Sequence, residues 1–501
     1  MESTSSPAPS QSLARDAIGL PEVLFQSITH MAPAAAVAFS IIAGAPYAGG
    51  GLPLSVVIAL IACLCVAVSI GELARHLPSA GGMYTYTARG LHPAVGFLVA
   101  WGYAFVEPLV APLLYLILGI VVAGTLDSEF NCFVCHADQW WIWVVVAAVL
   151  VFLLGYFGIQ LSTRAGTVLG FFEIAVFTAL ALWLIAKAGS RNTLGVFGTS
   201  HANVAGFKGL TGVFAGSIYA ILAFIGFEAA APLAEEARNP RRTIRQAVIY
   251  SCLGIGIFYV LTTYAATVFF GPDKMGGPNG FIALNDGDPW EGLGHMVWGA
   301  AWFVFLAIVN SAIANSNAGA NATTRTWYAM GRIRLLPSLF ASVHPHWKSP
   351  HVAVIAQLLV GIGVALGLGF SFQPLPAFIL IATMATAVVV LIYIALNLAS
   401  IVFHLRERRS EFNLFTHGVV PVVGILFFVP GWLTAVGIHA FSFIAHLTGP
   451  ASRVGIVVGA WYLIGVIYLI YLYSRAPQRV RDTGRIFIEP EPAAAAPAPT
   501  A

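Results

Sequence analysis

Long apolar stretches dominate this sequence and leave few choices for its fold. A helix that crosses a bilayer needs about 20 consecutive, mostly apolar residues. The chain has 501 residues, of which 58% are hydrophobic and only 9% are charged, against about 25% charged residues in a typical soluble domain. The sequence therefore predicts an all-α integral membrane protein with twelve transmembrane helices, at residues 22–43, 52–77, 94–124, 140–158, 167–188, 210–236, 244–270, 296–330, 351–370, 377–404, 418–446 and 454–474.

The two ends of the chain have compositions that cannot build a core. Residues 1–19 lack the cationic start and short apolar run of a cleaved signal peptide, and residues 476–501 end in a Pro/Ala-rich segment. Both are predicted to be disordered tails around one membrane domain at 20–475. The net charge of +3 gives no reason to expect a nucleic-acid partner, and five cysteines are too few and too scattered for a disulfide framework.

The positive charges predict the orientation. With a cytoplasmic N-terminus, most of the 24 Lys and Arg residues fall in cytoplasmic segments. Loops that stay in the cytoplasm carry an excess of Lys and Arg. The sequence therefore predicts a multi-pass protein of the cell membrane with both termini in the cytoplasm. The exceptions fall on the outer side: Lys187, Arg191, Lys208, Lys274 and Arg453.

Two of the predicted spans are interrupted where a helix in lipid should be uniformly apolar. The first has Pro33 among alanines, and the sixth has Gly226 and Pro232 on either side of Glu228. Proline removes a backbone donor and glycine weakens a helix, so the freed groups must face protein or a wet cavity. Corresponding breaks in two halves of a chain point to a transporter site near the membrane midplane. A kinked packing helix with a satisfied Glu228 remains the alternative.

Five spans separate the two breaks. An odd-numbered repeat inverts its second copy relative to the first, so residues of about 20–190 and 208–405 are expected to be inverted repeats, followed by two extra helices at about 418–475. The pattern predicts a secondary transporter.

Three motifs then resemble the amino acid–polyamine–organocation (APC) family of permeases, and in particular a less characterised bacterial branch of it. They are GELARHLPSAGGMYTYTARGLHP (71–93), FIGFEAAAPLAEEARNPRRTIRQA (224–247) and RTWYAMGRIRLLP (325–337), and the resemblance covers about 20–475. The third motif departs from the family at Ile333, where relatives usually have Asp or Asn.

The resemblance implies a five-plus-five inverted repeat (the LeuT-like or APC fold) in which unwound helices 1 and 6 bind the substrate. Relatives commonly carry Gly-Ser-Gly at the first break, whereas this chain has Ala32-Pro33-Ala34. Since Pro33 cannot donate a backbone hydrogen bond, both an α-amino acid and an amine remain open as substrates. The implied binding residues are Met31, Ala32, Pro33, Ala34, Ala35, Ala36, Phe224, Gly226, Phe227 and Glu228.

Carboxylates inside the membrane are the candidates for ion coupling. Glu173 in span 5 is the first choice, because proton-coupled relatives keep a titratable side chain near this place. Glu107 in span 3 is the rival, although neighbouring prolines suggest that it only supports a kink. Span 8 carries many Asn, Ser and Thr residues, which indicate either hydrogen bonding between helices or a sodium site. Protons are expected as the coupling ion and sodium is the alternative.

Charged residues at the cytoplasmic ends of the spans resemble the family's inner gate. The implied set is Arg75, Arg89, Glu235, Glu236 and Arg238, with Arg75 and Arg89 as partners for the other three. In an outer loop, Cys132, Cys135 and His136 have metal-like spacing, but two cysteines and one histidine do not complete a zinc site. No metal and no cofactor are expected.

The sequence thus predicts a proton-coupled importer of amino acids or related organic amines. Two alternatives stay open: an antiporter of the same fold and a membrane sensor that binds its ligand without moving it. An enzyme is disfavoured, because neither an HExxH zinc motif nor a nucleophile elbow is present.

Overall fold

The computed structural model describes residues 18–79, 81–130, 136–158, 163–332, 336–347 and 349–481. Among these residues, eleven helical segments are long and apolar enough to cross a membrane. The first, Leu20–His76, has 57 residues and contains both of the first two predicted spans. The prediction of an all-helical protein with many membrane-spanning segments is therefore confirmed.

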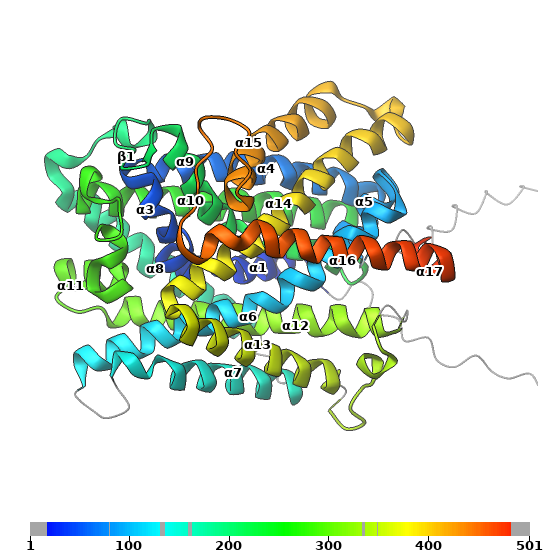
Figure 1. The fold of residues 1–501 in the computed structure, drawn as a ribbon, viewed down its shortest axis with the longest axis horizontal. Coiled ribbons are helices and arrows are strands. Elements are labelled where there is room, and N and C mark those ends of the chain that lie inside the picture. Colours follow the sequence, from blue (N-terminus) through cyan, green and yellow to red (C-terminus); the bar gives the residue numbers. More distant parts are fainter. Residues whose placement is uncertain are drawn as a thin grey trace, which may run out of the picture.

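Twelve of the helices form the body of the molecule, and most of them run along one common direction, horizontal in Figure 1. They are α1 (Leu20–Met31), α4 (Leu52–His76), α6 (Pro93–Glu129), α7 (Trp140–Tyr156), α8 (Thr163–Ala188), α9 (Leu210–Phe224), α10 (Pro240–Phe270), α12 (Trp302–Arg332), α13 (His351–Phe372), α14 (Pro374–Arg406), α15 (Val420–Val436) and α16 (Val454–Arg475).

Short elements lie at the two ends of this bundle. Helices α5 (Gly82–Gly90) and α17 (Pro477–Arg481) are at the right-hand end of Figure 1, and helix α11 (Pro289–Trp298) is at the left-hand end. Strands β1 (Asn203–Val204) and β2 (Phe207–Lys208) form a small antiparallel hairpin, with Asn203 opposite Lys208, and β1 is also at the left-hand end. Two further short helices, α2 (Pro33–Ala35) and α3 (Ala45–Ala48), follow α1.

Two predicted helix boundaries are wrong, both because of a glycine. The span predicted at 296–330 begins later, since Gly299 with φ 73° caps α11 and α12 starts at Trp302. The span predicted at 418–446 ends early, since Gly437 with φ 74° caps α15 after Val436. Glycine adopts this left-handed conformation readily and commonly ends helices.

Most of the two predicted tails lies outside the described residues, which begin at 18 and end at 481. The innermost residues of each tail are ordered, contrary to the prediction. Ile18 forms a parallel β-bridge with Ala237, and Pro477–Arg481 form helix α17. The predicted residues Cys132 and Cys135 also lie outside the described residues.

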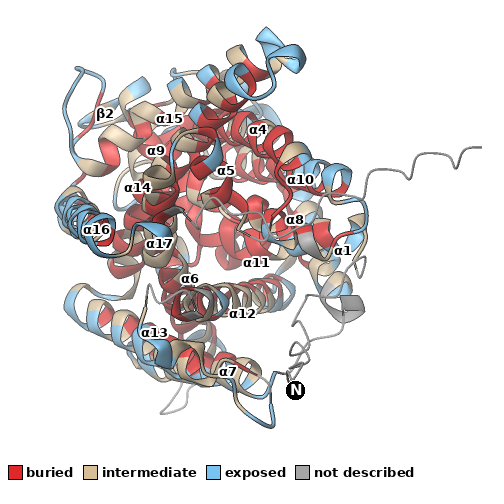
Figure 2. Cartoon of the chain, turned by 90° about the vertical axis from the view of Figure 1, so that its right-hand side faces the viewer, coloured by how far each residue is buried: buried red, intermediate tan, exposed pale blue. Residues whose placement is uncertain are grey.

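The core is at the centre of the bundle and the apolar rim faces outward. Figure 2, a view along the bundle, shows buried residues in α4, α9 and α14 and exposed residues on α7, α13 and α16. Helix α4 packs closely on α10, and α6 packs on α12 and α14. The exposed rim positions include large apolar side chains such as Leu359 and Ile456, which is 76% exposed. A surface of this kind fits contact with lipid rather than water.

Candidate functional site

Helix α1 ends at the first predicted break. Ala32 follows it with φ 46° and ψ 67°, in the left-handed region, and Pro33 then starts α2. The right-handed helical conformation is disfavoured for a residue that precedes proline, which explains why the chain departs from the helix at Ala32. A residue with a Cβ is uncommon in the left-handed region, so the surrounding structure must hold Ala32 there. The π-helical turn η1 (Ala36–Ser40) continues the chain.

Helix α9 ends at the second predicted break. Gly226 has φ 121°, a conformation open essentially only to glycine, and the chain continues as the 3₁₀-helix η7 (Phe227–Glu235). A Cβ placed on Gly226 would lie 2.6 Å from the carbonyl carbon of His30 in α1. Both the backbone conformation and the close approach of α1 therefore require glycine at this position.

The two breaks are in direct contact. Ser27 Oγ in α1 donates a hydrogen bond to the carbonyl oxygen of Phe227 at 2.9 Å. From α10, the hydroxyl of Tyr259 lies 3.0 Å from the carbonyl oxygen of Met31 and 2.9 Å from that of Ala223. These carbonyls are among those that the helix ends leave unpaired. Sequence reasoning missed Ser27 and Tyr259, although a polar group within an apolar span is the signal that could have found them.

All ten predicted binding residues lie at or beside this junction and are buried or nearly so. The junction is closed, with Phe224 and Phe227 fully buried and Phe224 edge-on to the ring of Tyr259. His30, which is 6% exposed, lies against Gly226. The arrangement places the interrupted ends of two helices, with backbone carbonyls bound by side-chain hydroxyls, around one buried point.

Glu228 folds back onto the second break. Its Oε2 accepts the backbone N–H of Gly226 at 2.9 Å, and Tyr393 of α14 contacts the same carboxylate. The side chain is 4% exposed. A carboxylate has about four acceptor sites, so Glu228 can brace the break and still accept a hydrogen bond from a ligand.

Glu173 approaches the first break from α8. Its carboxylate accepts a hydrogen bond from the side-chain amide of Asn310 in α12, while Ser311 and the backbone of Ala34 lie close to it. Helix α2 packs on both α8 and α12. One oxygen of Glu173 and the hydroxyl of Ser311 are buried without a hydrogen-bond partner among the described residues. Glu173 and the polar face of α12, predicted separately, thus meet at one place.

Glu107 lies in α6 within electrostatic range of Glu228. One of its carboxylate oxygens is buried without a hydrogen-bond partner among the described residues. Helix α6 continues through Pro108 and Pro112 from Pro93 to Glu129. Glu107 is therefore linked electrostatically to Glu228 at the second break.

The predicted inner-gate arginines bind other carboxylates in this conformation. Arg75 contacts Glu72 at 2.9 Å and Arg89 contacts Glu407 at 3.3 Å. The physical reason is proximity, because Glu72 is one turn before Arg75 on the same helix and Glu407 follows the end of α14. Glu236 and Arg238, two of the predicted partners, lie beside the N-terminal segment. The backbone N–H of Ile18 donates to the carbonyl of Glu236, and the backbone N–H of Arg238 donates to the carbonyl of Ile18. The side chain of Glu235 is not among those described.

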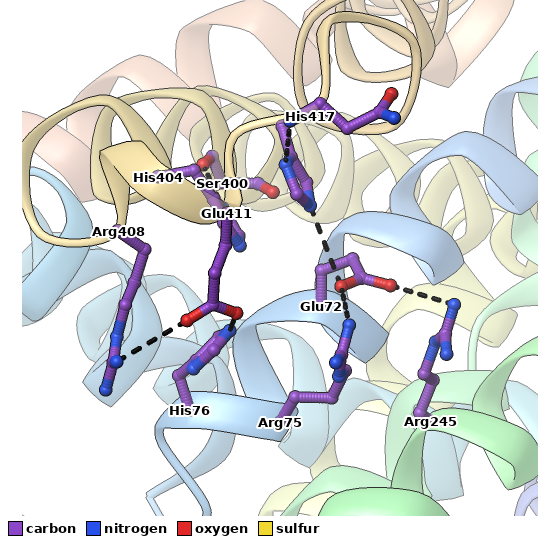
Figure 3. A network of polar contacts seen from close by, with 10 residues as sticks. Glu72, Arg75, His76, Arg245, Ser400, His404, Arg408, Glu411 and His417 are labelled. Carbon is purple, nitrogen blue, oxygen red and sulfur yellow. Dashed lines mark hydrogen bonds and ion pairs between the residues drawn. The ribbon is translucent and has the colours of Figure 1, made fainter.

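Glu72 is the centre of a polar network that sequence reasoning missed (Figure 3). It is 2% exposed, contacts Arg245 at 2.9 Å as well as Arg75, and lies 3.6 Å from Nε2 of His417. The ring of His417 stacks on that of His404 at 3.7 Å. The sequence places Glu72 at a helix end, where a charge is ordinarily solvated, and gives no sign of partners that follow 173 or more residues later.

Glu72, His404 and His417 are a group of metal-ligand type, with their ligand atoms within 4.8 Å of one another. Nδ1 of His404 contacts the carbonyl of Ser400, which leaves its Nε2 as a free acceptor. Nδ1 of His417 instead accepts the N–H of Asn413, so in the neutral ring the proton is on Nε2. This nitrogen then points a donor, not a lone pair, at Glu72, and the group does not fit a three-ligand metal site.

A second pair of buried carboxylates lies at the opposite end of the bundle, in α11 and outside the segments long enough to span a membrane. Glu291 accepts a hydrogen bond from Thr125, and the indole N–H of Trp290 donates to the carbonyl of Val37 at 3.1 Å. Burial raises the pKa of Asp288, and burial together with the charge of Asp288 raises the pKa of Glu291. Helix α11 therefore covers the chain just beyond the first break.

The comparison with known proteins decides the family. The pattern described as amino acid permease matches residues 22–476. The chain belongs to the amino acid permease family. This confirms the family assignment made from the three motifs.

The permease is similar to several bacterial transporters over most of its length. It is 25% identical over 469 residues to the low-affinity putrescine importer PlaP of Escherichia coli K12, covering 91% of this chain and 93% of that protein. It is 29% identical to the branched-chain amino acid permease BcaP of Bacillus subtilis, over 62% of this chain and 66% of that protein. It is 28% identical to the glutamate/serine transporter AimA of the same species, over 63% of this chain and 59% of that protein. These relatives transport amino acids or an amine.

Proposed function

We propose that this permease is a secondary active transporter that moves an amino acid or a related organic amine across the cell membrane by alternating access. The observation that carries the proposal is the contact between the two interrupted helices, which brings together, in the buried core, backbone carbonyls of both breaks that accept hydrogen bonds from side-chain hydroxyls. Broken helices that meet at a repeat interface are the usual construction of a transporter site.

The proposed topology has twelve crossings. The segment Leu20–His76, at 57 residues, is long enough to cross the bilayer twice, and these two crossings add to one crossing by each of the other ten segments. Two inverted repeats of five crossings, at about 20–190 and 208–405, precede the last two. The positive charges place both termini in the cytoplasm, so the end with α5 and α17 is the cytoplasmic end.

The proposed substrate carries an ammonium group, held by Glu228 and by the carbonyls of the two breaks. Glu228 is buried at the junction, and Glu107 is within electrostatic range of it. Carboxylates and carbonyls are acceptors, which suit an ammonium. At the first break Pro33 cannot donate to a carboxylate, so an amine without a carboxylate fits at least as well as an α-amino acid. The names of the relatives include both classes.

The proposed coupling ion is the proton and the proposed carrier is Glu173. Its carboxylate lies beside the first break, with one oxygen that has no hydrogen-bond partner among the described residues, so a change in its charge acts directly on α2. Glu107 is the second candidate. The oxygens of Ser311 and Asn315 on α12 are buried without partners among the described residues, which favours sodium as the one alternative ion.

Counterflow into liposomes tests the transport itself. The purified protein is reconstituted with unlabelled putrescine, leucine, serine or glutamate inside, and labelled ligand is added outside. A carrier exchanges label, whereas a sensor binds its ligand without exchange. Imposed proton and sodium gradients then separate symport from antiport and proton from sodium coupling. Binding of a ligand in a thermal-shift screen without any exchange of that ligand would overturn the proposal.

A further inference from the structure

A basic cavity of about 570 Å³ opens at the end of the bundle that carries α5 and α17, away from the junction of the broken helices. It lies between the end of α4, the start of α10 and the segment after α14. Its volume is within the range of small-molecule sites, about 300–1,000 Å³. Figure 3 shows several of its side chains. The lining residues are Arg75, His76, Asn239, Arg241, Arg242, Arg245, Gln246, Arg408 and Glu411.

Positive charge in this cavity exceeds the negative charge beside it. Five arginines line it, and among the described side chains the carboxylates that contact them are Glu411 in the wall and Glu72 behind it. Glu411 is shared between Arg408 at 3.5 Å and His76 at 3.4 Å. Arg241 and Arg242 form no ion pair with any side chain that the structure describes. Within the described part of the chain, at least these two guanidinium groups therefore have no counter-charge.

The guanidinium groups that do have partners are also accessible. The side chains of Arg75, Arg245 and Arg408 are 45%, 44% and 48% exposed. Each arginine has five N–H donors, and the contacts with Glu72 and Glu411 use only a few of them. The wall can thus donate many further hydrogen bonds to an anion.

Helix α10 adds its N-terminus to the same cavity. Asn239, the residue before its first turn, has φ 47° and makes no side-chain cap, and the helix that follows has 31 residues. The N-terminus of a helix carries a partial positive charge and unpaired N–H groups, which favour anions. Here the helix start and the arginines face one cavity.

We infer that this cavity binds a phosphate-bearing anion, either the headgroup of an anionic phospholipid or a small soluble phosphate compound. Phosphate matches the planar, bidentate donors of arginine and carries enough charge to balance several of them. The cavity is at an end of the membrane-spanning bundle, which gives both sources access to it.

The test is a titration of the purified full-length permease in a neutral detergent. The probes are the short-chain lipids dihexanoyl phosphatidylglycerol and dihexanoyl phosphatidylcholine, and inorganic pyrophosphate. The variant is R241Q/R242Q, since neither arginine has an ion-pair partner among the described side chains whose loss would disturb the fold. The matched control is R325Q/R475Q, which removes the same charge from two exposed residues outside the cavity.

One anionic probe, or both, is expected to bind with one molecule per chain. Each charge-assisted hydrogen bond contributes enough for R241Q/R242Q to weaken binding by about tenfold or more, while the control binds as the natural protein does. Binding of phosphatidylglycerol alone identifies a lipid site, and binding of pyrophosphate alone identifies a soluble ligand. Equal binding of phosphatidylcholine, equal weakening in the control variant, or no binding of either anion would overturn the inference.

Discussion

The two breaks interrupt their helices by different means. At the second, Gly226 adopts a conformation that glycine reaches readily, and its missing side chain lets α1 approach. At the first, a proline follows an alanine and disfavours the right-handed helix there, and the surrounding structure holds this alanine in the left-handed region. The second break therefore depends on the absence of a side chain, whereas the first stores strain in the backbone. Adding a side chain at Gly226 should therefore disrupt the junction, whereas removing the side chain of Ala32 should relieve strain.

The largest expected effect comes from filling the second break. Gly226→Val places a branched side chain 2.6 Å from the carbonyl carbon of His30 and demands φ 121° from a β-branched residue. We expect uptake in proteoliposomes to be abolished. Size-exclusion chromatography of the purified variant checks that the protein is still folded. Unchanged transport kinetics would show that the second break serves only packing.

The carboxylates Glu173 and Glu107 are expected to differ in their importance for proton coupling. Glu173→Gln keeps a hydrogen-bonding group beside the first break but cannot lose a proton. We expect exchange of substrate to persist and accumulation driven by a proton gradient to be lost. Glu107→Gln is the matched control, at the carboxylate that lies within electrostatic range of Glu228, and its effect should be milder. Gradient-driven accumulation that survives in Glu173→Gln and requires sodium would transfer the coupling role to α12.

The hydroxyl that joins the breaks is expected to have an intermediate effect. Tyr259→Phe leaves buried carbonyls of Met31 and Ala223 without their donor, and such a loss costs about 1–3 kcal/mol. We expect a lower midpoint of thermal unfolding. Tyr264→Phe, on the same helix but at an exposed hydrogen bond, is the control. Equal midpoints for both variants would mean that water already satisfies the carbonyls.

Helix α11, which covers the first break, should make stability depend on pH. The pKa values of Asp288 and Glu291 are raised in the folded protein, so the fold favours their protonated forms. Their contribution is complete below the ordinary carboxyl range of about 4 and is lost as pH rises through the raised values. We expect the unfolding midpoint to fall from pH 5 to pH 8. Asp288→Asn, which can still cap α11, should flatten this fall; an unchanged slope would locate the dependence elsewhere.

The smallest expected effect is a slight gain in stability from a substitution at the first break. Ala32→Gly relieves the left-handed strain, which is of order 1 kcal/mol, although glycine also increases the entropy of the unfolded chain. We expect the unfolding midpoint to stay the same or rise slightly. Ala35→Gly, in an ordinary helical conformation, is the control and should lower it. A drop at Ala32 as large as that at Ala35 would argue against stored strain.

The fold could be predicted largely from the sequence, because the length of an apolar run and the positions of Lys and Arg are local signals. Pro33 and Gly226 could be found for the same reason. Their partners could not: Tyr259 is one tyrosine in an apolar helix, and Glu72 meets Arg245 and His417 only after folding. Such contacts depend on which helices pack together, and a local sequence pattern does not predict this packing. In this conformation Arg75 and Arg89 contact Glu72 and Glu407, and their pairing with Glu235 and Glu236 stays a prediction.

The hydroxyl of Tyr259 also affects how α1 and α9 can separate. A hydroxyl carries a single hydrogen, so it can donate fully to the carbonyl of Met31 or to that of Ala223, not to both. If α1 and α9 separate during transport, the hydroxyl must stay with one of them. The carbonyl that it leaves is then buried and unpaired unless water or the substrate reaches it. Separation of the broken helices and hydration of the space between them are therefore linked events, and a dry junction resists opening.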